Sequence, residues 1–528
     1  MNEGPPIPNF DRERFERSVQ EAQAEAARTR ERQRLLESQS VPAEPTPSPL
    51  PRSVGDRPGM VAQGTGILDG ARVGARSIEH DFSPTPIPID SITPDGLREQ
   101  WVYDAKYDVP TQFPLIEWGR EWYGNGITPR GKNWFGETNL ARPQFYLFGD
   151  TRTAVIAGRN AAGRTDNWAS QANLFADLRV TDAGRFQAFL QPITDGGQNT
   201  RFELIDGRVE SRYEFNANPI TAFYEGDLGA ILGGLHGTSP PFELPITAGI
   251  IPLFFQNGIW LQDGLSGVAM ALPARHSRLL NWSNFDATFF ATFDRLNSPA
   301  FYDEDDIQTF GTAWFIDAYG GYIETGYAYL NDRQRPEQSY HNMAASFTRR
   351  YFDRVSNSVR VIVNTGQDLP KEDRCADGVL LLVENSLITP RPLRFVPYAN
   401  FFVGWDRPQS VSRAGVAGGI LRNTGINFET DALGGYVTLD DTGSDTAGGA
   451  LGVDLIGDDL DRQLLIEVAY QTPHGNANPG LPDDQFAVGT RYQIALTRAT
   501  ILRMDAMYGW RRGLEDVYGT RIEYRWKF

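Results

Sequence analysis

Charged side chains that recur at every second position are the residues of this chain whose types and spacing could act on a solute. In the C-terminal stretch 517–528, Arg521, Glu523 and Arg525 fall on one face of an extended chain, because successive side chains of a strand point to opposite sides. Mixed charges that face water set up a transverse field, order the water and discriminate among polar solutes. Strand parity assigns to this charged, pore-lining face Arg179, Arg185, Arg212, Arg491, Arg503, Arg521, Arg525, Asp177, Glu210, Glu214, Glu467, Asp505 and Glu523.

Two interpretations of these charges stay open. Arginine and carboxylate groups can pair across neighbouring strands and serve stability alone. Alternatively, the arginines can favour an anionic solute. Truncation of Arg503 and Arg521 to Ala, followed by reversal potentials in planar bilayers, separates the two interpretations.

Catalysis is not indicated. The five histidines show no paired spacing, and the adjacent His276 and Ser277 would point to opposite faces of a strand, so a hydrolase site is not expected. The acidic clusters at 303–306, 440–445 and 458–461 lack the spacing of a calcium loop and are expected to be solvated. We therefore predict no catalytic residue, no metal ligand and no cofactor, and we do not expect an enzyme.

The face opposite the charges is apolar. Four consecutive runs, at 463–470, 485–496, 502–511 and 517–528, alternate in this way, and each has the length that a tilted strand needs to cross a bilayer. The pattern predicts strands with lipid on one side and water on the other. The aromatic residues predicted to face the membrane are Tyr518, Tyr524, Trp526, Phe528, Tyr508 and Trp510.

With this alternation and the terminal Phe528, the chain resembles the bacterial outer-membrane β-barrel proteins, whose last strand typically ends in Phe. The resemblance implies insertion into the outer membrane by the barrel-assembly machinery. It covers roughly 141–528 and extends to porins and, more loosely, to alginate-export-like barrels. The family function would be passive or substrate-selective diffusion of ions, sugars or acidic polysaccharide. The strand pattern and the terminal residue carry this resemblance rather than a diagnostic motif.

Composition excludes several classes of protein. A net charge of −17 argues against nucleic acid as a partner, because binding phosphates needs a basic surface. The single cysteine, Cys375, can form no internal disulfide. No run of apolar residues is long enough for a transmembrane helix, which leaves a barrel possible because its strands are apolar at alternate residues only.

The first 140 residues differ from the rest of the chain. We expect 1–40 to be a charged, periplasmic α-helical segment, 41–81 a Pro-rich linker, and 82–140 an aromatic-rich pre-barrel segment or first strand. Residues 9–38 form either a solvated helix or one that binds the cell wall or a periplasmic partner. A thin heptad stripe favours the second interpretation and consists of Phe15, Val19, Ala22, Ala26 and Thr29. No signal peptide follows Met1, so we expect that it was removed from this numbering or that the start codon is displaced.

Within 141–528 the pattern predicts about 16 strands, in the range of roughly 14 to 18. A turn at 149–150 is expected to separate strands 143–149 and 153–159, and a further strand is expected at 208–215.

Two stretches fit the regular pattern poorly. The irregular stretch 244–280 is either a loop folded back into the barrel to narrow the pore, or a strand followed by an ordinary outer loop or short helix. With a strand at 433–439, parity places the long connection 406–430 at the end where connections should be short. This conflict implies a missed strand near 415–428 or an unusual loop.

The sequence thus predicts an all-β protein: a transmembrane, antiparallel, up-and-down β-barrel with an N-terminal helical and Pro-rich extension. It is expected to be a porin in the outer membrane of a Gram-negative-type bacterium, with a periplasmic N-terminus and a water-filled lumen. Its expected partners are outer-membrane lipid and small hydrophilic solutes, and a homo-oligomer is left open. One alternative is a structural outer-membrane anchor with a plugged lumen, and another is a soluble all-β binding protein whose aromatic faces pack together. Detergent requirement and single-channel conductance distinguish the three.

Overall fold

The computed structural model describes residues 114–119, 131–205, 207–301, 306–415, 418–429, 433–457, 460–497 and 499–528. The predicted helical segment 1–40 and the linker 41–81 lie outside these residues. The chain divides into two compact units, Met1–Gly74 and Ala75–Phe528, and every described residue belongs to the second unit. In this described part, no helix combines the length and apolar character needed to span a membrane.

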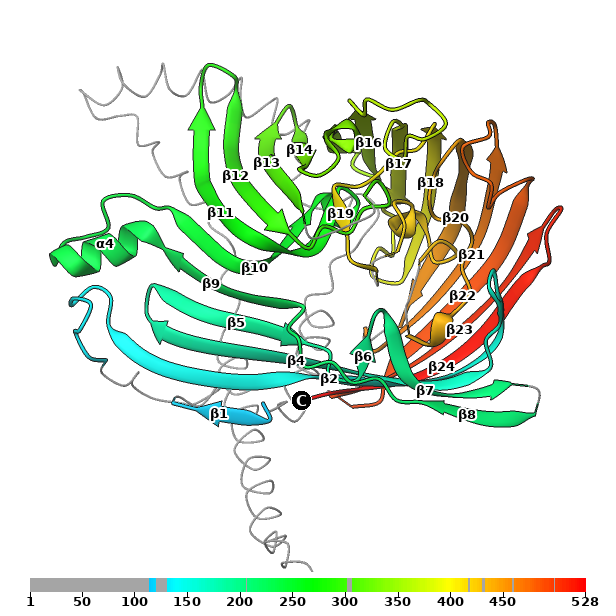
Figure 1. Ribbon diagram of the computed structural model, residues 1–528, viewed down its shortest axis with the longest axis horizontal. Helices are drawn as coiled ribbons and strands as arrows, with labels where there is room; N and C mark the ends of the chain where they lie inside the picture. Colours follow the sequence, from blue (N-terminus) through cyan, green and yellow to red (C-terminus); the bar gives the residue numbers. More distant parts are fainter. Residues whose placement is uncertain are drawn as a thin grey trace, which may run out of the picture. The chain divides into compact units, whose positions relative to one another are not determined.

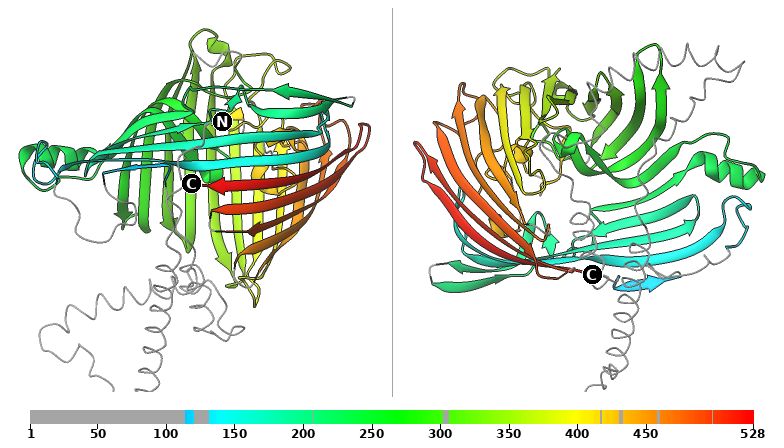
Figure 2. Two further views of the ribbon diagram at one scale, coloured as in Figure 1. Left: turned by 90° about the horizontal axis from the view of Figure 1, so that it is seen from below. Right: turned by 180° about the vertical axis from the view of Figure 1, so that it is seen from behind.

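Eighteen antiparallel strands of the described chain form one closed sheet (Figure 1). Each strand pairs with the next, and β24 returns to β2, where Ile522 lies opposite Val155. In the left view of Figure 2 this closure is visible as the red strand beside the cyan one. The wall strands are β2 (Ala141–Asn160), β4 (Asn167–Thr181), β5 (Gly184–Leu190), β9 (Thr221–Asp227), β10 (Pro245–Phe255), β11 (Leu261–Ser277), β12 (Trp282–Asp294), β13 (Ile307–Ala318), β14 (Gly321–Asp332), β15 (Tyr340–Tyr351), β16 (Val355–Thr365), β17 (Val379–Leu387), β18 (Phe395–Trp405), β20 (Thr446–Ile456), β21 (Arg462–Pro473), β22 (Gln485–Ala495), β23 (Thr500–Arg511) and β24 (Val517–Lys527).

The other described helices and strands are short and are not part of this wall. The helix α4 (Leu228–His236) begins where the Asp227 side chain accepts a hydrogen bond from the Ala230 amide at 2.6 Å, and it ends at Gly237, whose φ of 64° suits glycine. The remaining short elements are β1 (Ile116–Trp118), β3 (Gly163–Arg164), β6 (Thr194–Asp195), β7 (Gln198–Ile205), β8 (Arg208–Arg212), β19 (Ser412–Arg413) and the 3₁₀ turns η3 (Gln256–Gly258), η4 (Pro336–Gln338), η6 (Arg422–Thr424) and η7 (Leu433–Gly435).

The alternation of the sequence reappears as two faces of the wall. On β24, Val517, Arg521 and Glu523 are buried, whereas Tyr518, Ile522 and Tyr524, at alternate positions, are exposed. The same division continues through β23, β22 and β21. Because a sheet closed into a barrel leaves no free edge, its backbone groups are paired while one face meets the outside. The predicted fold class is confirmed, and the strand number lies at the upper end of the predicted range.

The two ends of the barrel differ in their connections. At one end the connections are mostly short, as at 182–183, 319–320 and 352–354, although 228–244 contains α4. At the other end the connections 191–220 and 406–445 are long. We call these the short-connection end and the long-connection end. Strand β2 begins and strand β24 finishes at the short-connection end.

The predicted turn at 149–150 is wrong, because β2 runs through it without a break. Gly149 exchanges backbone hydrogen bonds with Phe528 at 2.8 and 2.9 Å. A Cβ atom at Gly149 would lie 1.9 Å from the Asn173 carbonyl oxygen on β4. This glycine therefore permits a close approach between strands rather than a change of direction.

The wall strand predicted at 208–215 is also wrong. The wall passes from β5 to β9, while β7 pairs with β4 beyond the end of β5 and β8 pairs with β7. Residues 208–212 thus form the outer arm of a hairpin, and all of them are exposed. In the pre-barrel segment 82–140, the described residues form the short strand β1, which pairs with β2.

Two further expectations are corrected. Residues 244–280 are not a loop folded inward, because β10 and β11 pair along their length around the tight turn η3. Residues 433–439 are not a strand, because β18 pairs directly with β20. Removing that strand places the whole connection 406–445 at the long-connection end, so the parity conflict disappears.

Candidate functional site in the lumen

The connection between β18 and β20 folds back into the barrel. We call its described parts, 406–415, 418–429 and 433–445, the inward segment, and it is the yellow and gold chain inside the ring of strands in Figure 1. Its strand β19 pairs in parallel with β11. The Ser410 hydroxyl donates to the Ile259 carbonyl at 2.6 Å, and Asn342 donates to the Gln409 carbonyl at 2.9 Å. The backbone pairing with β11 and these side-chain hydrogen bonds hold the segment inside the barrel.

One side of the lumen is filled by apolar side chains. Trp260 is fully buried, and its indole nitrogen donates to Asn342 at 2.9 Å. A Cβ atom at Gly326 would lie 2.5 Å from the Trp260 ring, so the glycine makes room for it. Leu296, Tyr340 and the inward segment's Leu421 belong to the same buried cluster. The strands β21 to β24 and β2 to β5 on the opposite side carry charged side chains instead.

On that opposite side lies a set of charged side chains that we call the arginine cluster. Its members are Arg152, Arg422, Arg491, Arg503, Arg521, Arg525, Asp150, Glu429, Asp505 and Glu523. Six guanidinium groups and four carboxylates leave two net positive charges. Most of these residues line a cavity of about 400 Å³.

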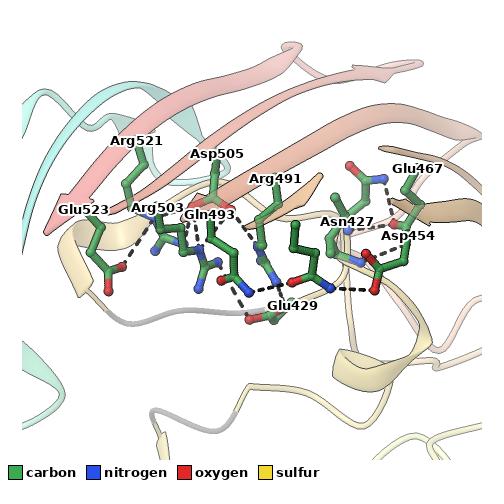
Figure 3. A network of polar contacts seen from close by, with 12 residues as sticks. Asn427, Glu429, Asp454, Glu467, Arg491, Gln493, Arg503, Asp505, Arg521 and Glu523 are labelled. Atoms are coloured by element: carbon green, nitrogen blue, oxygen red, sulfur yellow. Dashed lines mark hydrogen bonds and ion pairs between the residues drawn. The ribbon is translucent and has the colours of Figure 1, made fainter. Parts of the chain in front are cut away.

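Asp505 is the centre of the cluster (Figure 3). Its carboxylate accepts hydrogen bonds at 2.8 Å from three guanidinium groups, those of Arg491, Arg503 and Arg521. Arg521 is only 1% exposed, and its guanidinium lies 4.7 Å from the centre of the Tyr436 ring. Arg521 is thus covered by the inward segment, and its charge is satisfied inside the protein.

The cluster continues onto β2. Both Arg152 nitrogens, Nε and Nη2, donate to Glu523 at 2.8 Å. Arg525 pairs with Asp150, which also accepts a hydrogen bond from Asn173 at 2.7 Å. The bidentate pairing of Arg152 with Glu523 fixes the direction of both side chains. The remaining wall of the cavity carries Phe175, whose ring stacks on Phe189 at 4.6 Å.

A second cavity, of about 710 Å³, lies at the short-connection end. Arg185 contacts Asp177 at 3.3 Å and also pairs with Glu225. The charged side chains that line this cavity are Arg179, Arg185, Asp177, Asp182, Glu225 and Asp227. Four carboxylates and two arginines leave two net negative charges, opposite in sign to the arginine cluster.

The structure brings together only part of the predicted pore-lining set. Arg179, Arg185 and Asp177 line the acidic cavity, and Glu467 contacts the inward segment. Arg212, Glu210 and Glu214 are not near either group, because they belong to the β8 hairpin and the chain that follows it. The predicted residues found in the arginine cluster are Arg491, Arg503, Arg521, Arg525, Asp505 and Glu523.

Sequence reasoning missed five residues of this site. Asp150 and Arg152 share the parity of the charged face, but the expected turn at 149–150 removed them from it. Glu429, Arg422 and Tyr436 lie in the inward segment, where no period relates them to the wall. The alternation of 141–160 is interrupted by the apolar run 145–148, so no clear periodic signal in the sequence marks the first two residues.

Five of the six predicted membrane-facing aromatics are on the outer face and are 40% to 48% exposed; they are Tyr508, Trp510, Tyr518, Tyr524 and Trp526. Phe528 differs, since it is 7% exposed and its ring lies 5.1 Å from that of Trp526. It follows the last residue of β24 and pairs with Gly149, so it contributes little to the outer surface.

Burial also changes the titration of two groups in the inward segment. It raises the pKa of the Tyr436 hydroxyl. It lowers the pKa of Arg413 to about 10, and the charge of Arg422 acts in the same direction. Both groups keep their usual protonation state at neutral pH. In the part of the chain that the structure describes, no three His, Cys, Asp or Glu side chains are placed to hold a metal ion.

The closed sheet, with exposed aromatics outside and charged side chains inside, defines a porin-like transmembrane β-barrel. No family model matches the chain, and no curated protein matches it. Among solved structures it is similar to Pseudomonas aeruginosa OccK9 (OpdG), with 12% identity, 73% of this chain and 98% of that chain covered, and a TM-score of 0.48.

Two further structures are similar to the same extent. For Pseudomonas aeruginosa OccK2 (OpdF) the identity is 12%, with 73% of this chain and 97% of that chain covered and a TM-score of 0.46. For OpdK from the same organism, solved with vanillate, the identity is 13%, with 73% and 98% covered and a TM-score of 0.45. At these values the similarity carries no functional weight, so the function has to be argued from the chain's own residues.

Proposed function

We propose that this chain is an outer-membrane porin through which small hydrophilic solutes, preferentially anions, diffuse past the arginine cluster. The observation that supports it most is the cavity of about 400 Å³ beside the cluster, in a lumen whose other side is packed with apolar side chains. A barrel of this strand number encloses an aqueous channel unless it is plugged. Solutes that pass must therefore contact a cavity wall whose four arginines and three carboxylates leave one net positive charge.

The orientation follows from the connections. Outer-membrane barrels have short periplasmic turns and longer extracellular loops. The short-connection end would then face the periplasm, and both ends of the barrel chain would lie there. Residues 9–38 would be in the periplasm as well, where they could bind the cell wall or another partner.

The two alternative functions predict different properties of the protein. A soluble all-β protein would bury its aromatic faces against each other, whereas five of these side chains lie exposed on the outer face. An anchor with a plugged lumen would conduct no ions, so single-channel recording of the purified protein distinguishes it from a porin. A wild-type protein that inserts into planar bilayers without conductance would contradict the porin proposal.

Ion selectivity tests the role of the arginines. Arg525 and Arg422 line the cavity, and replacing each with Gln removes a positive charge while keeping a shorter polar side chain. Two unit charges about 8 Å apart in water interact with roughly 0.5 kcal/mol, which is about a twofold change in an equilibrium per charge. We expect reversal potentials in a KCl gradient to show anion preference falling by about that factor in each variant.

The matched control is Arg212→Gln, which removes the same charge from the exposed β8 hairpin. Its reversal potential should equal that of the wild type. If the control and the cavity variants shift alike, the selectivity comes from overall charge rather than from the arginine cluster.

A further inference from the structure

Glu467 is a carboxylate buried in the barrel wall that is bound by the inward segment. It lies on β21, is 1% exposed, and accepts hydrogen bonds from the backbone amides of Ile426 and Asn427, each at 2.9 Å. The Asn427 side chain donates a third bond at 2.8 Å, and the Tyr398 hydroxyl donates a fourth. A buried carboxylate is stable only when its acceptor sites are satisfied, and here the inward segment supplies three of the four donors.

Two glycines make this contact possible. A Cβ atom at Gly425 would lie 2.2 Å from Oε2 of Glu467, and one at Gly489 would lie 2.3 Å from the side-chain oxygen of Asn427. Any larger residue would push the inward segment off the wall. Gly425 has an extended backbone with φ of 176°, so an alanine there would be excluded by this contact and not by its backbone conformation.

Two residues further along the chain, Glu429 enters the arginine cluster. Its carboxylate accepts a hydrogen bond from Arg491 at 2.7 Å and lies 3.9 Å from Arg503. Figure 3 shows the Glu429 carboxylate at the guanidinium end of Arg491, with Asn427 and Glu467 beside this pair. The contact that holds 425–427 against β21 therefore also fixes the position of the Glu429 charge.

We propose that Glu467 is a positioning residue for ion selectivity. By binding residues 426 and 427 it holds the Glu429 carboxylate among the arginines, where it offsets one of their charges. Releasing this contact moves Glu429 away and leaves a more positive cluster. The inference rests on the proposed function, since selectivity has meaning only if the lumen conducts.

The test compares reversal potentials of full-length variants in planar bilayers under a KCl gradient. Glu429→Gln removes the counter-charge and should raise anion preference about twofold. Glu467→Gln should shift it in the same direction and by a similar factor, because the Gln amide cannot accept all the N–H groups that the carboxylate accepts. Gly425→Ala changes no charge at all, and it should produce the same shift because its Cβ displaces the segment.

The double variant Glu467→Gln/Glu429→Gln separates positioning from a direct effect of the lost charge. If Glu467 acts through Glu429, the double variant equals Glu429→Gln alone. Asp454→Asn is the control, because the Asp454 carboxylate accepts a hydrogen bond from Gln463 on the wall. Its shift of the reversal potential should be the same in the wild type and in Glu429→Gln.

Folding of each variant is checked by its heat-modifiable electrophoretic mobility. Should the wild type conduct with anion preference while Gly425→Ala and Glu467→Gln keep its reversal potential, the positioning role is overturned and the proposed function remains. Additive effects in the double variant overturn it as well. A wild type without conductance overturns the porin proposal, and this inference with it.

Discussion

At the residue scale, the lumen shows how a barrel interior pairs much of its charge. Asp505 pairs with three guanidinium groups, and Arg521, the most deeply buried of them, is covered by Tyr436. Charges bound this tightly stabilise the wall and are less accessible to solutes than Arg525. Some arginines of the set therefore pair with buried carboxylates, and others line the cavity. A preference of these arginines for an anionic solute stays a prediction.

Asp505→Asn tests the stabilising part. The variant removes the carboxylate that Arg521 contacts at 2.8 Å and leaves that of Glu523 at 4.0 Å, and breaking a buried ion pair typically costs about 3–5 kcal/mol. We expect the urea midpoint of unfolding to fall accordingly. Glu515→Gln is the control, because Glu515 pairs with Arg159 in an exposed position and should change stability by about 1 kcal/mol or less. An equal loss of stability in both variants would mean that burial of an ion pair does not determine how much the pair stabilises the fold.

At the element scale, glycines decide where strands and the inward segment approach each other. Gly149 lets β2 lie close to β4, and Gly519 and Gly509 on β24 and β23 face Val437 and Leu439 of the inward segment. Val437 and Leu439 are buried against these glycines. Buried residues at alternate positions are typical of a strand, and for this reason the sequence pattern of 433–439 predicted one. A single sequence shows that such residues are buried, but not whether they pack inside a barrel or belong to its wall.

Gly149→Ala tests the close approach of β2 and β4. The added methyl group would meet the Asn173 carbonyl at 1.9 Å, so strands must separate, at a cost of about 1–3 kcal/mol. Thermal unfolding followed by circular dichroism should show a lower transition temperature. Gly415→Ala is the matched control, because a Cβ there has no atom within 4 Å. A transition temperature equal to that of the wild type would show that β2 and β4 accept the added methyl group without separating.

At the scale of the whole molecule, the period of two residues was sufficient to predict a closed barrel and the last four strands, since each face is uniform over β21 to β24. The lumen could not be predicted in the same way. Its narrowing comes from the inward segment, whose contacts with β11, β15 and β21 join residues far apart in sequence. Contacts of that range leave no periodic signal.

The molecule is also electrically asymmetric along the lumen, and this gives its last prediction. The arginine cluster carries two net positive charges, and the cavity at the short-connection end carries two net negative ones. Fixed charges of opposite sign in series favour current in one direction, so we expect the current–voltage curve to be asymmetric at 0.1 M KCl. At 1 M KCl the Debye length falls from about 10 Å to about 3 Å, and the curve should become symmetric.

The variant Asp177→Asn/Glu225→Gln removes two carboxylates from the acidic cavity and should abolish most of the asymmetry at 0.1 M KCl. Glu515→Gln, which alters an exposed carboxylate between strands β23 and β24, should preserve it. A curve that is symmetric in the wild type at low salt, or one whose asymmetry persists unchanged at 1 M, would show that the two charge clusters do not lie along the path of the ions.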